Sequence, residues 1–479
     1  MHRRTKIVAT VGPACESPEQ LQELMVAGVD VFRLNFSHGD LNSKAMLIRR
    51  IRALSEQRQQ AVAILADLQG PKIRTGLMEG GSQHLIKNQQ VTITTRELIG
   101  KEGLIPARYP KLPGNVAIGE RILLDDGMLE LIVEKIEETE ISCRVVHGGK
   151  LKDCKGINLP GASVSVPCLT EKDLADLAFC IKEEVDFLAL SFVRHADDVK
   201  NLQERLHIAQ ANIPVIAKIE KPQAIDDFDN ILQAADGIMV ARGDLGVEIP
   251  PEQVPLLQKQ IIRKCNQAGK PVITATQMLE SMIDNPRPTR AETSDVANAI
   301  MDGTDAVMLS AETAAGKYPL EAVSLMVRVA VDVESDPLLR ESTFQPSPAT
   351  SGAEQQADAI GQAACHVAEN VSAAAILAFT QTGSTAALVA KYRPSLPIYA
   401  VTPSLTVRRQ LALHAGVQSI SVANVQNTEE QIHAMEIAAI DAGVLKPDDV
   451  VVITMGSPVS APGTTNLLKV HTLTGAENK

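Results

Sequence analysis

The chain is poor in aromatic residues and has no tryptophan. Phe, Trp and Tyr make up 3% of its 479 residues, and 58 acidic residues outnumber 46 basic ones, for a formal net charge of −12. Nucleic-acid-binding proteins use basic surfaces and stacked aromatic side chains, so we expect no nucleic-acid partner. A phosphate-containing small substrate would then need a local cluster of Lys, Arg and metal ions.

Long apolar segments and paired cysteines are also missing. No stretch approaches the roughly 18 apolar residues of a membrane-spanning helix, and the apolar run near the amino terminus is too short for a signal peptide. The seven cysteines include no CxxC pair, which is typical of reduced thiols. The sequence therefore predicts a cytoplasmic protein with no membrane partner.

Short apolar runs bounded by polar residues recur along the chain, with helical patterns between them. Such runs are typical of strands buried on both faces of a parallel sheet. Eight β/α units are the number that closes a (β/α)8 TIM barrel. We expect the strands at 5–12, 29–37, 61–69, 185–193, 214–220, 236–244, 270–278 and 304–312.

Two further segments differ from the predicted barrel in their sequence pattern. Residues 70–170 are rich in strand patterns and turns, which predicts a small β-barrel domain placed as a lid over the site. A Pro/Ser/Thr-rich linker around 334–355 precedes an open α/β domain of about five strands. The expected barrel, lid and C-terminal domains span 1–69 with 171–345, 70–170 and 346–479.

Charged residues end two adjacent predicted strands. Lys218 and Glu220 end the fifth strand, and Arg242 and Asp244 end the sixth. The carboxyl ends of barrel strands form the face that carries the active site. Two carboxylates with open positions suit Mg²⁺ or Mn²⁺, and a buried lysine could neutralise charge on a moving phosphoryl group. A structural salt bridge between neighbouring strands is the alternative.

Polar side chains also follow one face of the second strand. Arg33, Asn35 and Ser37 alternate with apolar residues there, and such side chains are costly to bury unless they meet a ligand. A polar plug of the barrel mouth is the other interpretation. Further acids, cations and hydroxyls stand at other strand ends and in the hinge of the insertion: Asp67, Lys72, Arg74, Thr276 and Ser310.

The sixth and seventh strand ends offer groups for an anion and a proton. The backbone N–H groups of Gly243 and Asp244 could bind a carboxylate as a small anion nest. The hydroxyl of Thr276 could relay a proton or simply cap a loop, and Ser310 has the same two interpretations.

Six sequence blocks occur in the order typical of the pyruvate kinase family: RLNFSHG, IAKIEKP, ARGDLGVE, TATQMLESM, PRPTRAE and MLSAETAAGKYP. The resemblance covers essentially the whole chain. It implies phosphoryl transfer from phosphoenolpyruvate to ADP, giving pyruvate and ATP in the last step of glycolysis. It also implies a divalent cation, an effector-binding C-terminal domain and a homotetramer.

The resemblance implies roles at matched positions. Glu220 and Asp244 would hold the divalent ion, and Lys218 would stabilise the transferring phosphoryl group. Arg33 would contact phosphate with Ser310 as its brace. The pyruvyl carboxylate would lie against Thr276 and the amides of Gly243 and Asp244. Nucleotide contacts are implied for Asn35, His38, Arg74, Lys155 and Asp126.

One departure from the family pattern concerns K⁺. Many pyruvate kinases hold K⁺ with residues that match Asn35, Ser37, Asp67 and the backbone of Leu68. Those enzymes have Thr and Glu where this chain has Leu68 and Lys72. Because a lysine ammonium can supply the fixed charge of a bound K⁺, we expect activity without K⁺.

The C-terminal domain contains the block FTQTGSTAALVAKYRP, which resembles the family's effector loop. Hydroxyls and helix-start amides between a strand and a helix can hold a phosphate, although an ordinary N-cap is the alternative. The loop at 456–466 lacks the Trp and Arg of some fructose-1,6-bisphosphate-regulated members, which favours a sugar monophosphate or AMP. The candidate residues are Thr380, Thr382, Gly383, Ser384 and Thr385.

Two other functions remain open from the sequence. A Mg²⁺-dependent C–C lyase or aldolase of a pyruvate enolate would also place carboxylates and Arg at strand ends, but it would not depend on ADP. A catalytically idle metabolite sensor would only bind phosphorylated ligands.

Overall fold

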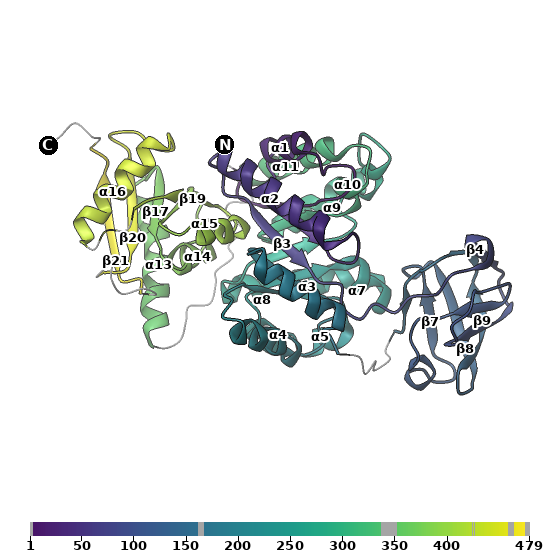
Figure 1. Ribbon diagram of the computed structural model, residues 1–479. Helices are drawn as coiled ribbons and strands as arrows, with labels where there is room; N and C mark the ends of the chain where they lie inside the picture. The colour runs from purple at the N-terminus through teal and green to yellow at the C-terminus, as the bar shows by residue number, and fades with distance from the viewer. Residues whose placement is uncertain are drawn as a thin grey trace.

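The computed structural model describes residues 3–160, 167–336, 352–423, 425, 427–457 and 464–474. The expected linker around 334–355 and the loop at 456–466 lie partly outside these residues. The chain forms a closed barrel, an inserted β-rich domain and a C-terminal α/β domain, with the last two on opposite sides of the barrel (Figure 1). The predicted α/β fold built on a TIM barrel is confirmed.

Eight parallel strands close the barrel in the order β1-β16-β15-β14-β13-β12-β3-β2. Each lies inside its expected range: β1 Lys6–Thr10, β2 Val31–Asn35, β3 Ala63–Asp67, β12 Phe187–Leu190, β13 Val215–Ile219, β14 Gly237–Ala241, β15 Val272–Ala275 and β16 Ala306–Leu309.

Helices surround the barrel: α1 Pro18–Ala27, α2 Leu41–Gln57, α3 Glu171–Lys182, α4 Ala196–Ile208, α5 Pro222–Asp226, α6 Phe228–Ala234, α7 Arg242–Glu248, α8 Val254–Ala268, α9 Arg290–Met301, α10 Ala311–Ala314 and α11 Pro319–Ser335, with 3-10 turns η3 Pro251–Gln253 and η4 Glu280–Ile283. Within the part of the chain that the structure describes, no helix combines the length and apolarity needed to cross a membrane.

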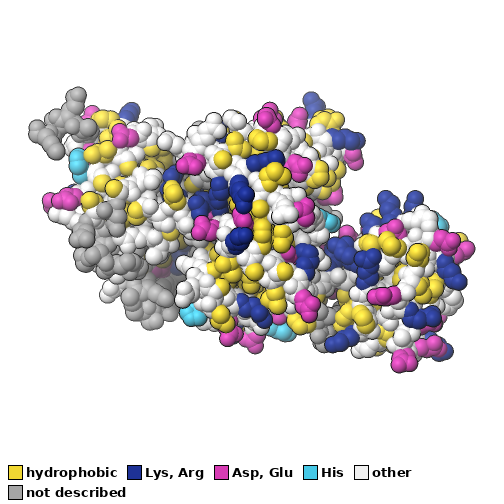
Figure 2. Space-filling model, in the orientation of Figure 1, with side chains coloured by type: hydrophobic (Ala, Val, Ile, Leu, Met, Phe, Trp, Pro, Cys, Tyr) yellow, Lys and Arg dark blue, Asp and Glu magenta, His cyan; other side chains and the backbone are white. Residues whose placement is uncertain are grey.

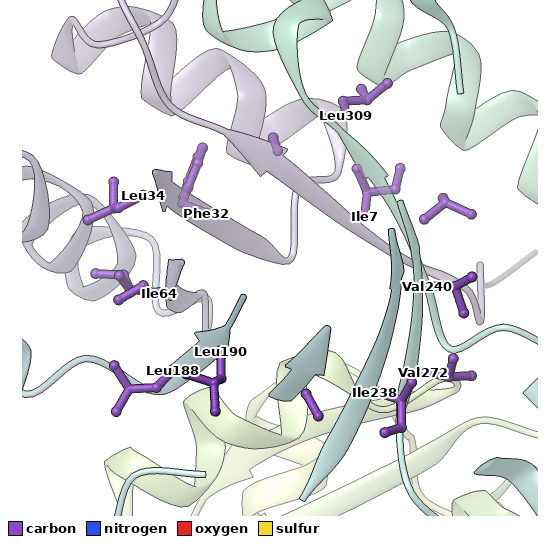
Figure 3. Close-up of a cluster of buried hydrophobic side chains, with 14 of the residues drawn as sticks. Ile7, Phe32, Leu34, Ile64, Leu188, Leu190, Ile238, Val240, Val272 and Leu309 are labelled. Atoms are coloured by element: carbon purple, nitrogen blue, oxygen red, sulfur yellow. The ribbon is translucent and has the colours of Figure 1, made fainter. Parts of the chain in front are cut away.

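Side chains of the barrel strands alternate between two buried layers. Ile7 and Ile64 belong to the outer layer, which packs against the helices (Figure 3). Their neighbours Val8 and Leu65 belong to the inner layer, which fills the barrel. Because both faces are apolar, these strands occur in the sequence as uninterrupted apolar runs.

An aspartate precedes every second barrel strand and caps the strand before it. In each case a side-chain oxygen accepts a backbone N–H near the start of the preceding strand, at 2.7 to 3.0 Å. The contact recurs once per two β/α units and ties β1 to β2, β3 to β12, β13 to β14 and β15 to β16. The four residues are Asp30, Asp186, Asp236 and Asp305.

The inserted domain has its own apolar core and two sheets. A six-stranded sheet has the order β11-β7-β8-β9-β5-β6, and β10 pairs with β4. The elements are η1 Glu79–Gly81, β4 Ser82–Leu85, β5 Gln90–Thr94, β6 Leu104–Pro106, η2 Leu112–Asn115, β7 Arg121–Leu124, β8 Leu129–Ile136, β9 Glu140–His147, β10 Gly149–Lys152 and β11 Ile157–Asn158.

The C-terminal domain contains the expected five-stranded sheet, in the order β19-β18-β17-β20-β21, with β21 antiparallel. Its elements are α13 Gly352–Asn370, β17 Ala375–Phe379, α14 Ser384–Lys391, β18 Ile398–Thr402, α15 Leu405–Gln410, η5 Leu411–Leu413, β19 Val417–Ser421, α16 Thr428–Asp441, β20 Val450–Met455 and β21 Leu467–Thr472.

The C-terminal domain docks on the amino-terminal end of the barrel through polar and apolar contacts. Arg409 Nε donates to Asp186 Oδ1 at 2.7 Å, and Arg393 pairs with Asp305. Leu413 belongs to the same buried cluster as the side chains that fill the barrel. Two of the four capping aspartates therefore also hold the C-terminal domain.

Candidate active site

The inward-facing positions of the barrel strands change from apolar to polar at their carboxyl ends. Arg33 of β2 donates from Nε to Asp67 Oδ2 of β3 at 2.7 Å and from Nη1 to Thr10 Oγ1 of β1 at 2.9 Å. Ser191, just after β12, donates to the carbonyl of Leu68 at 2.8 Å. Adjacent strands thus carry a continuous polar arc at the barrel mouth.

Lys218 of β13 lies at the centre of this arc. Its Nζ lies 2.8 Å from Ser191 Oγ, 3.2 Å from Asp67 Oδ1 and 2.8 Å from Glu220 Oε1. An ammonium group has three N–H donors, and these three oxygen atoms provide one acceptor for each of them. Burial alone would lower the pKa of Lys218, but the carboxylates of Asp67 and Glu220 outweigh burial and raise it. The lysine is therefore a fixed, buried positive charge.

The two carboxylates around Lys218 differ electrostatically. Burial would raise the pKa of Asp67, but Lys218 and Arg33 lower it below the usual value. Burial raises the pKa of Glu220, and the Asp244 carboxylate adds to this against the attraction of Lys218. Glu220 therefore carries negative charge that its protein neighbours neutralise only in part.

Glu220 and Asp244 fit a hard divalent cation that keeps other oxygen ligands. Glu220 Oε2 accepts the N–H of Phe192 at 2.8 Å, which fixes the side chain. Among the described residues, no group of three or more His, Cys, Asp or Glu side chains could hold a metal ion. Two protein carboxylates suit Mg²⁺, which usually retains waters and substrate oxygens.

The structure corrects the expected extent of the sixth strand. β14 ends at Ala241, and the expected strand residues 242–244 form the first turn of helix α7. Gly243 donates its N–H to Thr276 Oγ1 at 2.7 Å. The Gly243 amide was predicted to bind the substrate carboxylate. It is therefore hydrogen-bonded to Thr276, which was predicted to contact the same carboxylate.

Thr276 lies in a strained turn after β15. Its φ is 66° and that of Gln277 is 55°, a region that costs a β-branched residue about 1–3 kcal/mol. Arg242 holds this turn, because its Nη2 donates to the carbonyl of Thr276 at 2.8 Å and its Nη1 pairs with Asp295 at 2.7 Å. Backbone strain of this kind, held by an arginine that is mostly buried, is typical of a functional site.

Lys72 connects the inserted domain to the barrel. Its Nζ lies 3.9 Å from Asp244 Oδ1 and 3.8 Å from Asp126 Oδ1. The expected monovalent-site residue Asp67 is paired with Arg33 and Lys218. In this arrangement the Lys72 ammonium lies beside Asp244.

The other predicted monovalent-site residues lie along the same mouth. Asn35 Oδ1 accepts the N–H of Ser37 at 2.9 Å. Leu68 is buried, and its N–H donates to the carbonyl of Ala189 at 3.0 Å.

The predicted nucleotide residues lie where the inserted domain joins the barrel, a region rich in Lys and Arg (Figure 2). Burial and the nearby cations of Arg74, Lys44 and Lys72 lower the pKa of His38, so its imidazole is neutral at pH 7. Arg74 Nη1 donates to the carbonyl of Cys154 at 3.2 Å. Lys155 pairs with Asp125 at 2.8 Å, and Asp126 lies near Lys72.

Ser310 lines a cleft of about 870 Å³ together with Lys72, Gly243, Asp244 and Thr276. Its backbone N–H donates to Glu312 Oε2 at 2.7 Å. Across the described ranges no direct bond joins Ser310 to Arg33, which contacts Thr10 and Asp67 instead. The expected bracing of Arg33 by Ser310 is therefore absent from this arrangement.

The candidate effector loop divides into buried and accessible hydroxyls. Thr380 Oγ1 accepts the N–H of Gly383 at 2.8 Å, and Thr385 bonds to Thr465 at 2.9 Å. The hydroxyls of Thr382 and Ser384 lie 3.0 Å apart on the exposed side. Thr382 and Ser384 could meet a ligand, whereas Thr380 and Thr385 shape the loop.

Sequence reasoning missed Thr10 and Ser191, and it placed Arg242 at a strand end without giving it a role. Extending the period-two pattern of inward positions one step past the apolar residues of β12 would have reached Ser191. The same step on β1 reaches Thr10. The role of Arg242 gave no such signal, because it depends on the turn at Thr276 and on Asp295 of α9.

Comparisons with known proteins match nearly the whole chain. The family models described as pyruvate kinase barrel domain and pyruvate kinase alpha/beta domain match residues 2–323 and 358–471. The pyruvate kinase of Geobacillus stearothermophilus is 50% identical over 99% of this chain and 81% of that relative. Pyruvate kinase 2 of a Synechocystis strain is 48% identical over 98% of this chain and 79% of that relative.

The crystal structure of a pyruvate kinase from Cryptosporidium parvum superposes with a TM-score of 0.90 at 39% identity, over 98% of this chain and 96% of the other. Sequence and fold therefore agree along the barrel, the inserted domain and the C-terminal domain, and the chain belongs to the pyruvate kinase family of phosphotransferases.

Proposed function

We propose that the chain transfers the phosphoryl group of phosphoenolpyruvate to ADP, giving ATP and the enolate of pyruvate, which is then protonated. The observation that carries this proposal is the buried ammonium of Lys218, fixed by Ser191, Asp67 and Glu220 at the barrel mouth. Phosphoryl transfer needs positioning and charge neutralisation rather than a nucleophilic side chain. A fixed cation beside a metal-binding pair of carboxylates meets that need.

The proposed residue roles are those that the family resemblance implies at the matched positions. Glu220 and Asp244 hold Mg²⁺, the cation that the family generally uses, or Mn²⁺. When bound, the ion neutralises charge on the phosphoryl and enolate oxygens. Lys218 and Arg33 stabilise the transferring phosphoryl group from the protein side. Asn35, His38, Arg74, Lys155 and Asp126 contact the nucleotide.

The pyruvyl group would lie against the turn at Thr276. The substrate carboxylate takes the N–H groups of Gly243 and Asp244, which frees the Thr276 hydroxyl from its bond to Gly243. That hydroxyl then faces the enolate carbon that is protonated, and Ser310 lines the same cleft.

A coupled assay for pyruvate, with and without ADP, tests this function. Pyruvate formation that depends on both ADP and Mg²⁺ supports it. Release of pyruvate without ADP would instead favour the lyase or aldolase, and binding without turnover would favour the sensor.

The enzyme is further proposed to work without K⁺. The ammonium of Lys72 brings a fixed positive charge to the mouth that contains Asn35, Ser37, Asp67 and Leu68. The rate with Mg²⁺ in tetramethylammonium buffer is measured with and without KCl. A rise of about tenfold or more with KCl, worth about 1.4 kcal/mol, contradicts the proposal.

A phosphorylated metabolite, a sugar monophosphate or AMP, is proposed as the allosteric activator at the effector loop. Thr382 and Ser384 present hydroxyls at the start of α14, where amides favour a phosphate. Alanine at these two positions should abolish activation in effector titrations and leave the unactivated rate unchanged. Retained activation would exclude this loop.

We also propose a cytoplasmic homotetramer, as the family resemblance implies. Sedimentation equilibrium of the purified chain tests the subunit number, and cell fractionation tests the compartment. A monomer at assay concentrations contradicts the first proposal.

A further inference from the structure

Glu248, the last residue of α7, is a buried carboxylate in an unfavourable place. Its side chain is 2% exposed, and a negative charge at the carboxyl end of a helix opposes the helix dipole. Its Oε1 accepts from Lys221 Nζ at 2.6 Å and from Asn158 Nδ2 at 3.0 Å. A buried charge of this kind persists only where its partners are held in place.

The two partners come from different domains. Lys221 lies between β13 and α5 of the barrel, close in sequence to Glu220. Asn158 ends β11, by which the chain leaves the inserted domain. Glu248 therefore joins the hinge of the inserted domain to the barrel at a single carboxylate oxygen.

The same short helix begins at the active site. α7 has seven residues, which at 1.5 Å per residue makes it about 10 Å long. It carries Gly243 and Asp244 at its first turn, and Lys72 of the inserted domain lies 3.9 Å from Asp244. α7 lies on the side of the barrel that faces the inserted domain (Figure 1). Both ends of one helix are thus tied to that domain.

Packing alone does not fix the hinge. A cavity of about 50 Å³ lies where the two hinge segments, which carry Ile73 and Leu159, face Phe192 and Lys221 of the barrel. Gln223 also lines it, and its Oε1 has no hydrogen-bond partner among the residues described. Where apolar contacts are incomplete, directional bonds such as those of Glu248 decide the angle between the parts.

We infer that Glu248 is a positioning residue: through Asn158 and α7 it couples the angle of the inserted domain to the placement of Gly243 and Asp244. The inference rests on the proposed substrate and metal roles of those two residues. When the inserted domain swings away from the barrel, Glu248 loses its bond to Asn158. The position of the inserted domain in which this bond is made is therefore favoured over the open one.

The test replaces the partner in the inserted domain and leaves Glu248 and Lys221 intact. Asn158→Asp sets a carboxylate against Glu248, and Asn158→Ala removes the bond. Spin labels at M128C in the inserted domain and I208C in the barrel, both exposed positions, report the distance between the domains in a C154S background. Gln83→Ala, which removes bonds to Leu104 and Gly103 inside the inserted domain, is the matched control.

The expected result for both Asn158 variants is a longer and broader distance distribution. At the same time, KM for phosphoenolpyruvate should rise about three- to tenfold, which corresponds to the free energy of one hydrogen bond. The change in kcat should be smaller. The control should leave the distances and KM as in the wild type. Unchanged distances in Asn158→Asp, or a raised KM without a change in distance, would overturn the inference.

The wild-type assay keeps this outcome separate from the proposed function. If the wild type forms pyruvate with ADP and the variants show no shift, only the coupling through Glu248 fails. If the wild type forms no pyruvate, the proposed function fails. The distance measurement still shows whether the bond between Asn158 and Glu248 sets the angle of the inserted domain.

Discussion

Ser191 offers the sharpest test of how Lys218 is held. Replacing Ser191 by alanine removes one of the three acceptors of the ammonium and leaves Asp67 and Glu220 in contact with it. The positive charge therefore stays, but its position is no longer fixed by the hydroxyl, which is itself anchored to the carbonyl of Leu68. Lys218→Met removes the charge as well, so the two variants separate position from charge.

The magnitudes follow from these contacts. A hydrogen bond to a charged group is worth about 1.5–3 kcal/mol, and the two remaining carboxylates place Ser191→Ala at the lower end. Each 1.4 kcal/mol is about tenfold in rate, so kcat should fall about tenfold. Loss of a preorganised charge at a reacting oxyanion costs about 10²–10³ or more, so Lys218→Met should be far slower than Ser191→Ala.

The assay is pyruvate formation at saturating ADP and Mg²⁺, with phosphoenolpyruvate varied to separate kcat from KM. Circular dichroism and the thermal unfolding midpoint show whether each variant is folded. A folded Ser191→Ala enzyme with kcat within about twofold of the wild type, a difference near 0.4 kcal/mol, would refute the reasoning.

Two further predictions concern other parts of the molecule. Asp186→Asn should destabilise the protein by about 1–3 kcal/mol more than Asp236→Asn. The NH2 group of the new asparagine is a donor, and it must then face another donor, either a guanidinium or a backbone N–H. By calorimetry this is an unfolding midpoint lower by about 1 °C per kcal/mol, because the entropy of unfolding grows with chain length, and Arg409→Leu should shrink the excess; equal midpoints for the two Asn variants contradict it. Arg242→Leu should release the strained turn at Thr276 and slow deuterium incorporation into the pyruvate methyl group about tenfold, and the effect should vanish in a Thr276→Ala background. Additive losses in that double-mutant cycle would show that Arg242 acts elsewhere.

The barrel was predictable because its strands are buried on both faces. Runs such as those of β3 and β13 have no polar residue until the carboxyl end, so both their position and their polar ends stand out in the sequence. Lys218 and Glu220 were found in this way, since a charge after an apolar run is conspicuous. The family resemblance then supplied roles that geometry alone leaves open.

The remaining details depend on long-range contacts. The change from β14 to α7 at Ala241 is set by neighbours that meet only in the fold, among them Thr276 and Asp295, so the run around Arg242 resembled a continuing strand. Ser191 looked like an ordinary strand residue because one hydroxyl among apolar side chains is a weak signal. The pairing of Lys72 with Asp244 depends on where the inserted domain lies, which no local pattern encodes.

The side chains that fill the barrel come from two domains. Ala412 and Leu413 of the C-terminal domain belong to the same buried cluster as Val8, Ile216 and Met239 of the strands. A fragment that ends after α11 would expose this apolar interior to water at the amino-terminal end of the barrel. The catalytic barrel is therefore not a separable module, and truncated forms used for screening or crystallisation should retain η5 to remain soluble and folded.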